Sequence, residues 1–576
     1  MSSRKELIRL FQELTELLIL DEGGPQSFRV RAYENATDSI KSSRDDLSEM
    51  TVSKLTKISG IGKSSATKIR EYFDTGMITR LAELREKYPS EFVALGRIPG
   101  LGPKTLLRLR DELGVENLDG LKAAIAGEKI RALKGMGAKS EEKIAKAIER
   151  IGSKQDRKPI GDALPLAEDL CEEIAELPDV VQVQYAGSLR RFRETIADID
   201  IVVASDNPAP IMEYFVGMSR VSEVLNNGET KSSVVTHVGI QVDLRVVKPG
   251  EYGAALLYFT GSKTHNIKLR QRALDQGCTL NEYGLVELES QKTLASKSEE
   301  DIYKALGLPW ISPEMREDLG EVEAAANAKL PKLLEVKDLK GDLHVHSEYS
   351  GDAKSPIAEV VHRAKELGYS YIGITDHAID LRINGVSVED HAKIAQELVS
   401  LRSENPELLI LHGCELNIGK DGQLDYDPDE RAKFDYCLGS IHSHFDLDSK
   451  TQTKRLIAAM EDPCVRILGH MLARSIGKRP PIECDIDEVL KAAIANNVAI
   501  EVNSGLSRLD APDDVLRRAC ELGNVFSVNS DAHHADHLSG IRFGVLQSHR
   551  GWIPADRVIN SWPVDKFSRW LSQGAE

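Results

Sequence analysis

The sequence predicts a multidomain protein in which an α-helical front, an α+β middle and a rear βα barrel follow one another. Three observations predict this fold class. Three Gly-x-Gly turns, each followed by an amphipathic helical pattern, lie in residues 58–148. Alternating strands that carry aspartates lie in residues 183–247, and seven strand-like runs alternate with helical patterns after residue 341. A chain of 576 residues is long enough for several hydrophobic cores.

Charge and histidine are distributed unevenly along the chain. The net charge is −17, yet residues 1–160 carry 30 Lys and Arg against 24 Asp and Glu, which leaves −23 for the remainder. A basic front is suited to phosphate contacts. Only His237 and His265 of the 15 histidines precede residue 340, so the rear of the chain is where metal chemistry is expected.

The sequence shows no pattern of membrane insertion or of a disulfide framework. No apolar run approaches the roughly 18 residues that span a bilayer, and the seven cysteines include no Cys-x-x-Cys pair. We therefore expect reduced thiols and a cytoplasmic, nucleoid-associated monomer with no membrane contact.

The three front turns read "ISGIGKSSATKIREYF" (58–73), "IPGLGPKTLLRLRDEL" (98–113) and "LKGMGAKSEEKIAKAI" (133–148). Glycine permits a tight turn with positive φ, and the N–H groups that begin the next helix attract an anion. The pattern resembles the helix-hairpin-helix, which binds nucleic-acid backbone without reading sequence. The glycines expected to contact DNA are Gly60, Gly62, Gly100, Gly102, Gly135 and Gly137.

The middle of the chain contains three strand aspartates. In "VQYAGSLRRFRETIADIDIVV" (183–203), period-2 alternation puts Asp198 and Asp200 on one strand face, and "GIQVDLRVV" places Asp243 in another strand. Three such carboxylates can hold two Mg²⁺ ions that orient a triphosphate and a hydroxyl nucleophile. An isolated Asp-x-Asp is more often a solvent-facing pair, so the downstream sequence decides between these alternatives.

Downstream, "YFTGSKTHNIKLRQRA" (258–273) and "LNEYGL" (280–285) complete a pattern with "GSLRR" and the aspartates. It resembles the family X DNA polymerases, the group that includes polymerase beta, and implies a nucleotidyltransferase palm with a thumb. The resemblance assigns the two Mg²⁺ ions to Asp198, Asp200 and Asp243, with Asp243 as the base for the primer 3′-hydroxyl. The nucleotide-binding residues that it implies are Arg157, Gly187, Ser188, Arg191, Tyr258, Phe259, Gly261, Asn266 and Arg270.

The chain departs from that family at a few positions. Lys68 matches the Schiff-base lysine of a 5′-deoxyribose-phosphate lyase, and Tyr33 matches a supporting position. Ser64 stands where the family has a phosphate-binding lysine, so lyase activity and a solvated surface lysine remain open alternatives. Ala197 replaces a frequent glycine, and we expect activity to survive that change.

Most rear strand-like runs end in His, Asp or Glu. The runs are "DLHVH", "YIGITDH", "LLILHGCEL", "YCLGSIHSH", "VRILGHM", "VAIEVNSG" and "FSVNSDAHH". In a parallel barrel the strand ends meet at one mouth. Imidazole and carboxylate groups gathered there suit Zn²⁺, Mn²⁺ or Fe. A lone histidine would more often be a core or capping residue.

The rear motifs resemble the PHP (polymerase and histidinol phosphatase) domain, which implies a distorted TIM-like (β/α)7 barrel. The resemblance implies up to three Mn²⁺ or Zn²⁺ ions, with Glu415 as a bridge between two. Its nine ligands are His344, His346, Asp352, His377, Glu415, His442, His470, Asp531 and His533. "YSGDAK" departs from the family's Ser-Asp-Gly at Asp352, and Arg474 is expected to hold a phosphate oxygen.

Together the resemblances imply a family X polymerase that fills short gaps in gapped or nicked double-stranded DNA with dNTPs. The rear would act as a 3′→5′ exonuclease, with abasic-site cleavage or 3′-end processing, in base-excision repair or end processing. Alternatives are a rear small-molecule phosphatase, a rear scaffold, or a non-enzymatic DNA-end bridging protein. The expected regions are 1–85 and 86–155 (two helix-hairpin-helix domains), 156–250 (palm), 251–320 (thumb), 321–340 (linker) and 341–576 (PHP).

Overall fold

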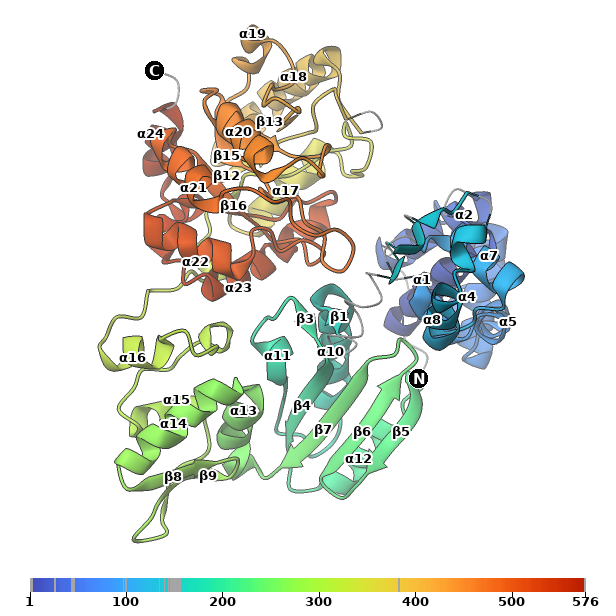
Figure 1. The fold of residues 1–576 in the computed structure, drawn as a ribbon, viewed down its shortest axis with the longest axis vertical. Coiled ribbons are helices and arrows are strands. Elements are labelled where there is room, and N and C mark those ends of the chain that lie inside the picture. Colours follow the sequence, from blue (N-terminus) through green and yellow to red (C-terminus); the bar gives the residue numbers. More distant parts are fainter. Residues whose placement is uncertain are drawn as a thin grey trace. The chain divides into compact units, whose positions relative to one another are not determined.

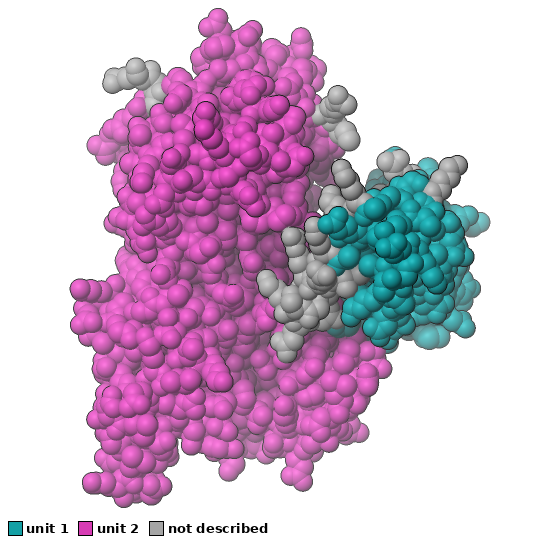
Figure 2. All heavy atoms as spheres, viewed as in Figure 1, with its two compact units in different colours: residues 1–156, 237–239 teal, residues 157–236, 240–576 magenta. Residues whose placement is uncertain are grey.

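The computed structural model describes residues 4–24, 27–42, 47–96, 98, 101–133, 135–138, 140–142, 144–145, 157–381 and 384–573. Two compact units make up the chain (Figure 2). Unit 1 contains residues 1–156 and 237–239, and unit 2 contains residues 157–236 and 240–576.

The described part of unit 1 before residue 157 is helical. Its α-helices are α1 (Arg4–Asp21), α2 (Phe28–Ser42), α3 (Val52–Leu55), α4 (Lys63–Thr75), α5 (Thr79–Lys87), α6 (Ser90–Leu95), α7 (Pro103–Leu113) and α8 (Leu118–Ala126). Apolar residues from both expected front domains form a single hydrophobic core, which includes Leu7, Phe11, Ile69 and Leu109. This arises because α1 packs against α2, α5 and α7.

The palm is a five-stranded sheet in the order β2-β4-β7-β6-β5. The strands are β2 (Gln182–Tyr185), β4 (Asp198–Ala204), β5 (Val221–Asn227), β6 (Lys231–Thr236) and β7 (Gln241–Val247). A separate two-stranded ladder joins β1 (Lys158–Pro159) to β3 (Thr195–Ile196). The palm helices are α10 (Ile160–Ala175), α11 (Gly187–Arg190) and α12 (Pro208–Val216). The central strands β4 and β7 run parallel, which places their first residues at the same sheet edge.

The thumb combines helices with a small antiparallel sheet in the order β10-β9-β8. Its elements are α13 (Tyr252–Thr260), α14 (Lys263–Asp275), β8 (Cys278–Asn281), β9 (Gly284–Glu287), β10 (Thr293–Ala295) and α15 (Glu299–Ala305). The connecting segment that follows includes α16 (Glu321–Ala326), whose Val322 and Ala325 join the thumb core. Farther along, Leu334 and Leu339 join a core of the rear domain, so this segment packs against both neighbours.

The rear domain is the predicted (β/α)7 barrel (Figure 1). Seven parallel strands pair in chain order: β11 (Gly341–Asp342), β12 (Tyr371–Ile374), β13 (Leu409–Asn417), β14 (Tyr436–Ser440), β15 (Val465–Leu468), β16 (Ala499–Asn503) and β17 (Phe526–Asn529). A parallel bridge between Val345 and Ala532 brings the two outer strands together, so the barrel is nearly closed.

Helices cover the outside of this barrel, and the strands between them are buried. The helices are α17 (Ile357–Glu366), α18 (Val388–Glu404), α19 (Pro428–Arg431), α20 (Ser449–Met460), α21 (Ile486–Ala495), α22 (Asp513–Leu522), α23 (Ile541–Arg550) and α24 (Val564–Ser572). Continuous apolar runs are typical of strands buried on both faces. Among the described helices, none combines the length and the apolar character needed to cross a membrane.

Candidate functional sites

Three aspartates meet at one edge of the palm sheet. Asp198 and Asp200 lie on β4, and Asp243 on β7 is the register partner of Asp200. Residues two apart on a strand share a face, while the intervening Ile199 is buried in the palm core. The structure therefore brings the three carboxylates into one cluster.

The charges in this cluster repel one another. Burial, together with the charges of Asp198 and Asp243, raises the pKa of Asp200 to about 7. Burial and then the charge of Asp243 also raise the pKa of Asp198. Lys231 Nζ, 3.4 Å from Asp243 Oδ2, offsets part of the negative charge. A hard divalent cation with oxygen ligands fits this site because it would offset the remainder.

The glycine-serine turn approaches these carboxylates closely. Gly187 begins α11 with φ of +62°, and a Cβ there would collide with Asp200 Oδ2. Ser188 follows in the first turn of α11, and Arg191 caps its end. Arg191 Nη1 donates to the carbonyl of Thr260 at 2.5 Å. The turn thus places a hydroxyl and a guanidinium beside the aspartate edge.

Two further residues expected at the nucleotide lie around the same edge. Arg157 Nε donates to Thr195 Oγ1 at 3.1 Å, and the charge of Arg157 lowers the pKa of Asp198 against the effect of burial. Phe259 lines a small cleft with Asp200 and Asp243. These contacts place Arg157 and Phe259 within reach of a ligand held at the carboxylates.

The remaining expected residues lie on the thumb helices. Asn266 Nδ2 donates to the carbonyl of Tyr258 at 2.8 Å. Arg270 Nε donates to the carbonyl of Asn266 at 3.3 Å. Gly261 has φ of +72° and lies against the guanidinium of Arg191. The α13–α14 junction therefore adjoins the glycine-serine turn of the palm.

In the rear barrel, Glu415 is the centre of a dense cluster of imidazoles. Its carboxylate lies 2.7 Å from His377 Nδ1, 2.9 Å from His470 Nε2 and 3.3 Å from His442 Nε2. The Nε2 atoms of His344 and His346 lie 3.5 and 3.6 Å from Glu415 Oε2. A carboxylate in this position is placed to bridge two ions.

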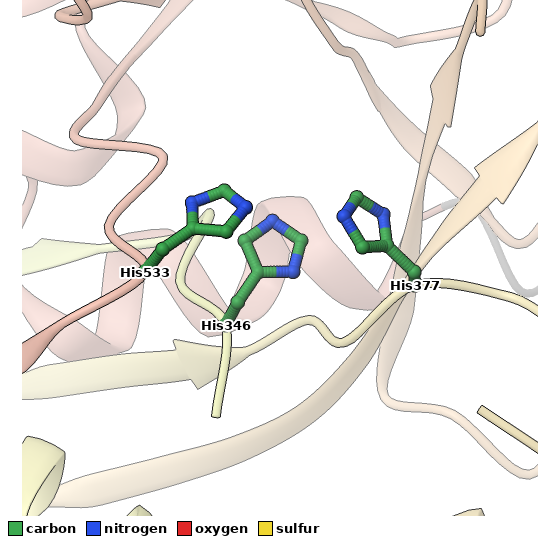
Figure 3. Close-up of side chains that lie close together, drawn as sticks. All are labelled: His346, His377 and His533. Carbon is green, nitrogen blue, oxygen red and sulfur yellow. The ribbon is translucent and has the colours of Figure 1, made fainter. Parts of the chain in front are cut away.

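The other three expected ligands complete the cluster. Asp531 Oδ1 lies 3.3 Å from His346 Nε2. Asp352 Oδ2 lies 3.5 Å from His377 Nε2 and 3.6 Å from His533 Nε2, so the departure in "YSGDAK" keeps it in the cluster. Figure 3 shows His346 between His377 and His533, with both ring-centroid distances at 4.3 Å.

The unsatisfied polar atoms of this cluster fit metal ions. Three groups have ligand atoms at metal-binding spacing: His346, His377 and His533; His344, His346 and Asp531; and His377, Glu415 and His442. Within this described cluster, His344 Nε2 and both nitrogens of His346 are buried without a hydrogen-bond partner. A buried polar atom without a partner is costly, and coordination to an ion removes that cost. These residues form a candidate multinuclear metal centre.

The protonation states of the imidazoles in this cluster also fit a metal centre. Burial and the neighbouring rings of His377 and His533 hold the pKa of His346 at about 3, so this imidazole is a neutral potential ligand. Burial lowers the pKa of His377, but the Glu415 carboxylate outweighs that effect and raises it to about 10. A metal ion would replace the proton that His377 otherwise holds against Glu415.

Sequence reasoning missed the residues that orient these ligands. Glu501 Oε1 accepts a hydrogen bond from His344 Nδ1 at 2.7 Å, and Glu501 Oε2 accepts one from the backbone N–H of His470 at 2.6 Å. Asn417 Oδ1 accepts one from His442 Nδ1 at 2.6 Å. Polar residues in the buried runs "HGCELN" and "AIEVN" were the available signal, because a buried polar group needs a partner.

The expectation for Arg474 needs correction. Arg474 Nη1 donates to Glu194 Oε2 of the palm at 2.5 Å, and Nη2 donates to the carbonyl of Leu509. The side chain is buried in this contact between the palm and the barrel. Arg474 therefore joins the two domains, because its guanidinium finds its partners there.

The helix-hairpin-helix glycines lie in unit 1. Gly62 and Gly102 are the N-caps of α4 and α7, and Gly60 and Gly135 have φ of +83° and +82°. Gly137 accepts hydrogen bonds through its carbonyl from the backbone N–H groups of residues 140 and 141. Gly100 lies outside the described residues.

The expected lyase residues lie together in unit 1, where Ser64 is exposed, Lys68 is half-buried and Tyr33 is buried in the core. Lys68 Nζ donates to Ser64 Oγ at 3.2 Å, and Ser64 Oγ lies 2.9 Å from Tyr33 Oη. The ammonium of Lys68 lies 5.3 Å from the Tyr33 ring centroid. Ser64 thus lies beside Lys68, the position at which the resemblance implies a second cation.

The fold and the two sites define a chain that joins a palm and thumb to a PHP-type barrel. Family models match it at 255–317 (DNA polymerase beta thumb), 342–505 (PHP domain), 2–78 (helix-hairpin-helix domain) and 92–150 (SAM-like helix-hairpin-helix tandem). It is 37% identical over 573 residues, 99% of each chain, to DNA polymerase/3′-5′ exonuclease PolX of Bacillus subtilis (strain 168). The chain belongs to this PHP-containing family of X-type DNA polymerases.

Two other relatives match part of the chain. A probable phosphatase of Aliivibrio fischeri (strain MJ11) is 28% identical over 233 residues, which is 38% of this chain and 89% of the relative. DNA polymerase lambda of Rattus norvegicus is 24% identical over 329 residues, which is 50% of this chain and 52% of the relative.

Proposed function

We propose that this chain adds nucleotides to the primer end of gapped or nicked double-stranded DNA and shortens such ends in the 3′→5′ direction. The observation that carries the proposal is the presence of two separate clusters on one chain. The palm brings together Asp198, Asp200 and Asp243 beside the Gly187–Arg191 turn. The barrel gathers imidazoles around Glu415.

In the palm, each residue has a defined task in nucleotide addition. Ser188 and Arg191 hold oxygens of the dNTP triphosphate by charge-assisted hydrogen bonds. Asp243 accepts the proton of the primer 3′-hydroxyl as that oxygen attacks the α-phosphorus, the bond from the α-phosphorus to the bridging oxygen breaks, and pyrophosphate leaves. The aspartate edge suits two Mg²⁺ ions, which supply charge neutralisation and in-line alignment when bound.

The thumb completes the nucleotide site. Tyr258, Phe259 and Gly261 pack against the sugar, where a close fit excludes a ribose 2′-hydroxyl. Asn266 and Arg270 reach the minor-groove side of the new base pair, where the acceptor pattern is common to correct pairs. Their position on α13 and α14, adjoining the palm turn, supports these roles.

In the barrel, the nine ligands would hold Mn²⁺ or Zn²⁺, up to three ions, with Glu415 as a bridge. Such ions supply activation of a water molecule and neutralise a phosphodiester. Glu501 and Asn417 keep the Nε2 atoms of His344 and His442 directed at the cluster. The substrate is the 3′ end of DNA, with abasic-site or 3′-end processing as related reactions.

The rest of the proposal concerns DNA handling. The Gly-x-Gly turns contact the DNA backbone, Lys68 forms the Schiff base of a lyase reaction, and the chain acts in base-excision repair or end processing as a nucleoid-associated cytoplasmic monomer. We also propose the boundaries 1–85, 86–155, 156–250, 251–320, 321–340 and 341–576. The division after residue 156 and the family matches support them.

The experiment uses a gapped duplex with a 5′-labelled primer, in Mg²⁺ or Mn²⁺, with and without dNTPs. The wild type is expected to extend the primer with dNTPs and to shorten it without them. Asp198→Ala should shorten but not extend, and His344→Ala should extend but not shorten. The matched pair separates the two sites within one chain.

Extension by Asp198→Ala would contradict the palm assignment. If His344→Ala still shortens the primer, the nuclease lies elsewhere. Hydrolysis of p-nitrophenyl phosphate without shortening of DNA would instead favour a small-molecule phosphatase; the relative from Aliivibrio fischeri is named a probable phosphatase.

A further inference from the structure

Helix α23 of the barrel ends against the glycine-serine turn of the palm. Its last residue, Arg550, donates through Nη1 to the carbonyl of Arg191 at 2.7 Å and to Glu317 Oε1 at 3.2 Å. Its Nη2 donates to Asp513 of α22. Arg550 is only 5% exposed, so these contacts form in a water-poor interface. One buried side chain of the barrel thus reaches the palm residue expected to bind triphosphate.

Glu317 joins the two arginines. Arg191 Nε donates to the same Glu317 Oε1 at 3.1 Å, while Arg191 Nη1 donates to the carbonyl of Thr260. Arg193 Nη1 lies farther from Glu317 Oε1, at 3.9 Å. Arg550 therefore fixes Arg191 twice, through its backbone carbonyl and through the carboxylate that holds its guanidinium.

We propose that Arg550 is a positioning residue of the nucleotide-addition site, supplied by the PHP barrel, that orients Arg191 for the dNTP triphosphate. The proposal rests on the proposed role of Arg191 in nucleotide addition. Glu317 and Thr260 hold the Nε and Nη1 sides of the Arg191 guanidinium, which leaves Nη2 to meet a phosphate oxygen. Arg550 keeps Glu317 in that position and satisfies the carbonyl at the end of α11.

The chemistry of the contact favours arginine. The guanidinium of Arg550 donates from Nη1 to Arg191 and Glu317 and from Nη2 to Asp513. A lysine ammonium has a single nitrogen and cannot reproduce this planar arrangement of donors. The positive charge also matters because Glu317 would otherwise be neutralised by Arg191 and the more distant Arg193 alone.

A second contact of the same helix provides a matched control. Arg542 of α23 makes a two-point ion pair with Glu168 of α10, at 2.7 and 2.8 Å. This pair also joins barrel to palm, but its palm partner lies on α10 and not on the glycine-serine turn. Figure 1 shows α23 at the side of the barrel next to the palm elements α10 and α11.

The test measures steady-state dNTP addition to a gapped duplex for the full chain with Arg550→Ala, Arg550→Lys and Arg542→Ala. Arg550→Ala is expected to raise the KM for dNTP by roughly tenfold, the effect of about one lost charge-assisted contact. The KM for the DNA primer and primer shortening without dNTPs should stay as in the wild type. Arg550→Lys should give an intermediate KM, and Arg542→Ala the wild-type KM.

A double variant checks the route of the effect. Glu317→Gln leaves Arg191 and Arg550 without their shared carboxylate, so the KM for dNTP should rise. In the double variant Glu317→Gln/Arg550→Ala, the total fold-rise in KM should be smaller than the product of the fold-rises in the two single variants. Thermal unfolding of each variant reports folding, and Arg550→Lys tests the contact if Arg550→Ala does not fold.

Several results would overturn the inference. An unchanged KM for dNTP in Arg550→Ala would do so, as would an equal rise in Arg542→Ala, because the effect would then come from the interface in general. These results leave the proposed function standing, since that depends on Asp198→Ala, which should lose extension at any dNTP concentration.

Discussion

Glu501 and His344 form a buried hydrogen bond of 2.7 Å between side chains that lie 157 positions apart in the chain. Neither residue is exposed. The carboxylate binds Nδ1 of the imidazole, which leaves Nε2 directed at Glu415 and Asp531, 3.5 Å from an oxygen of each. Glu501 therefore selects which nitrogen of His344 can bind a metal.

Glu501→Gln is expected to weaken Mn²⁺ binding and primer shortening about 10- to 100-fold, because an amide orients His344 less strongly than a carboxylate. Nucleotide addition should remain unchanged. Calorimetric Mn²⁺ titration and the metal dependence of primer shortening measure the two effects. Glu488→Gln, at an exposed position of α21, is the control. Equal Mn²⁺ affinity in Glu501→Gln and the wild type would contradict this role.

Asp200→Asn should change stability in a pH-dependent way. The folded-state pKa of Asp200 is about 7, against an ordinary value of 3.8. Between these values the folded state binds more protons than the unfolded state, so the free energy of unfolding falls as pH rises. Asparagine does not titrate, so Asp200→Asn removes this loss. Without metal, the difference in Tm between the variant and the wild type should therefore grow from pH 4 to pH 7 and then level off.

The same Asp200→Asn variant should lose nucleotide addition, since it removes an oxygen ligand of the palm. Scanning calorimetry in a chelator at several pH values measures the stability change. Asp206→Asn removes an exposed carboxylate just after β4 and provides the control. A gain in Tm that is equal at pH 4 and pH 8 would show that Asp200 is not responsible for the titration.

Gly187→Ala should abolish nucleotide addition without removing any carboxylate. A Cβ at this position collides with Asp200 Oδ2, and φ is +62°. Gly277→Ala carries the same type of backbone strain, with φ of +73°, but its Cβ meets nothing within 4 Å. Primer extension should therefore be lost in Gly187→Ala, where the new Cβ collides with Asp200, and kept in Gly277→Ala, where only the backbone is strained. Similar losses in both variants would mean that strain alone accounts for the effect.

Ser64→Lys should increase lyase activity. Ser64 Oγ lies 3.2 Å from Lys68 Nζ, so a lysine there would bring a second cation to a 5′-phosphate beside the Schiff-base amine. Borohydride trapping of a 5′-deoxyribose-phosphate end measures the adduct, which should rise in Ser64→Lys and disappear in Lys68→Ala. Lys63→Ala, at the neighbouring exposed position, serves as control. Trapping that persists in Lys68→Ala would assign the amine elsewhere.

Much of the fold could be predicted from local patterns. The rear strands and helices alternate in the sequence, which predicts parallel strands with helical crossovers. The resemblance to the PHP domain implied that they form a barrel, and the structure has seven parallel strands in a nearly closed barrel. The nine expected metal ligands also meet, since the ends of parallel strands share one mouth. The joint core of unit 1 was harder to predict, because amphipathic helices do not specify which neighbours they cover.

The sequence by itself determined the chemistry: the period-2 spacing of Asp198 and Asp200, the Gly-x-Gly turns, and histidines at successive strand ends. These depend on residues close together in the chain, whose geometry the backbone fixes. Only the tertiary structure decided that Glu501 holds His344, that Arg474 pairs with Glu194, and that Arg550 reaches Arg191. Glu501 meets His344 through the folding of the barrel on itself, and the other two pairs form where the barrel packs against the palm. No local pattern specifies either kind of contact.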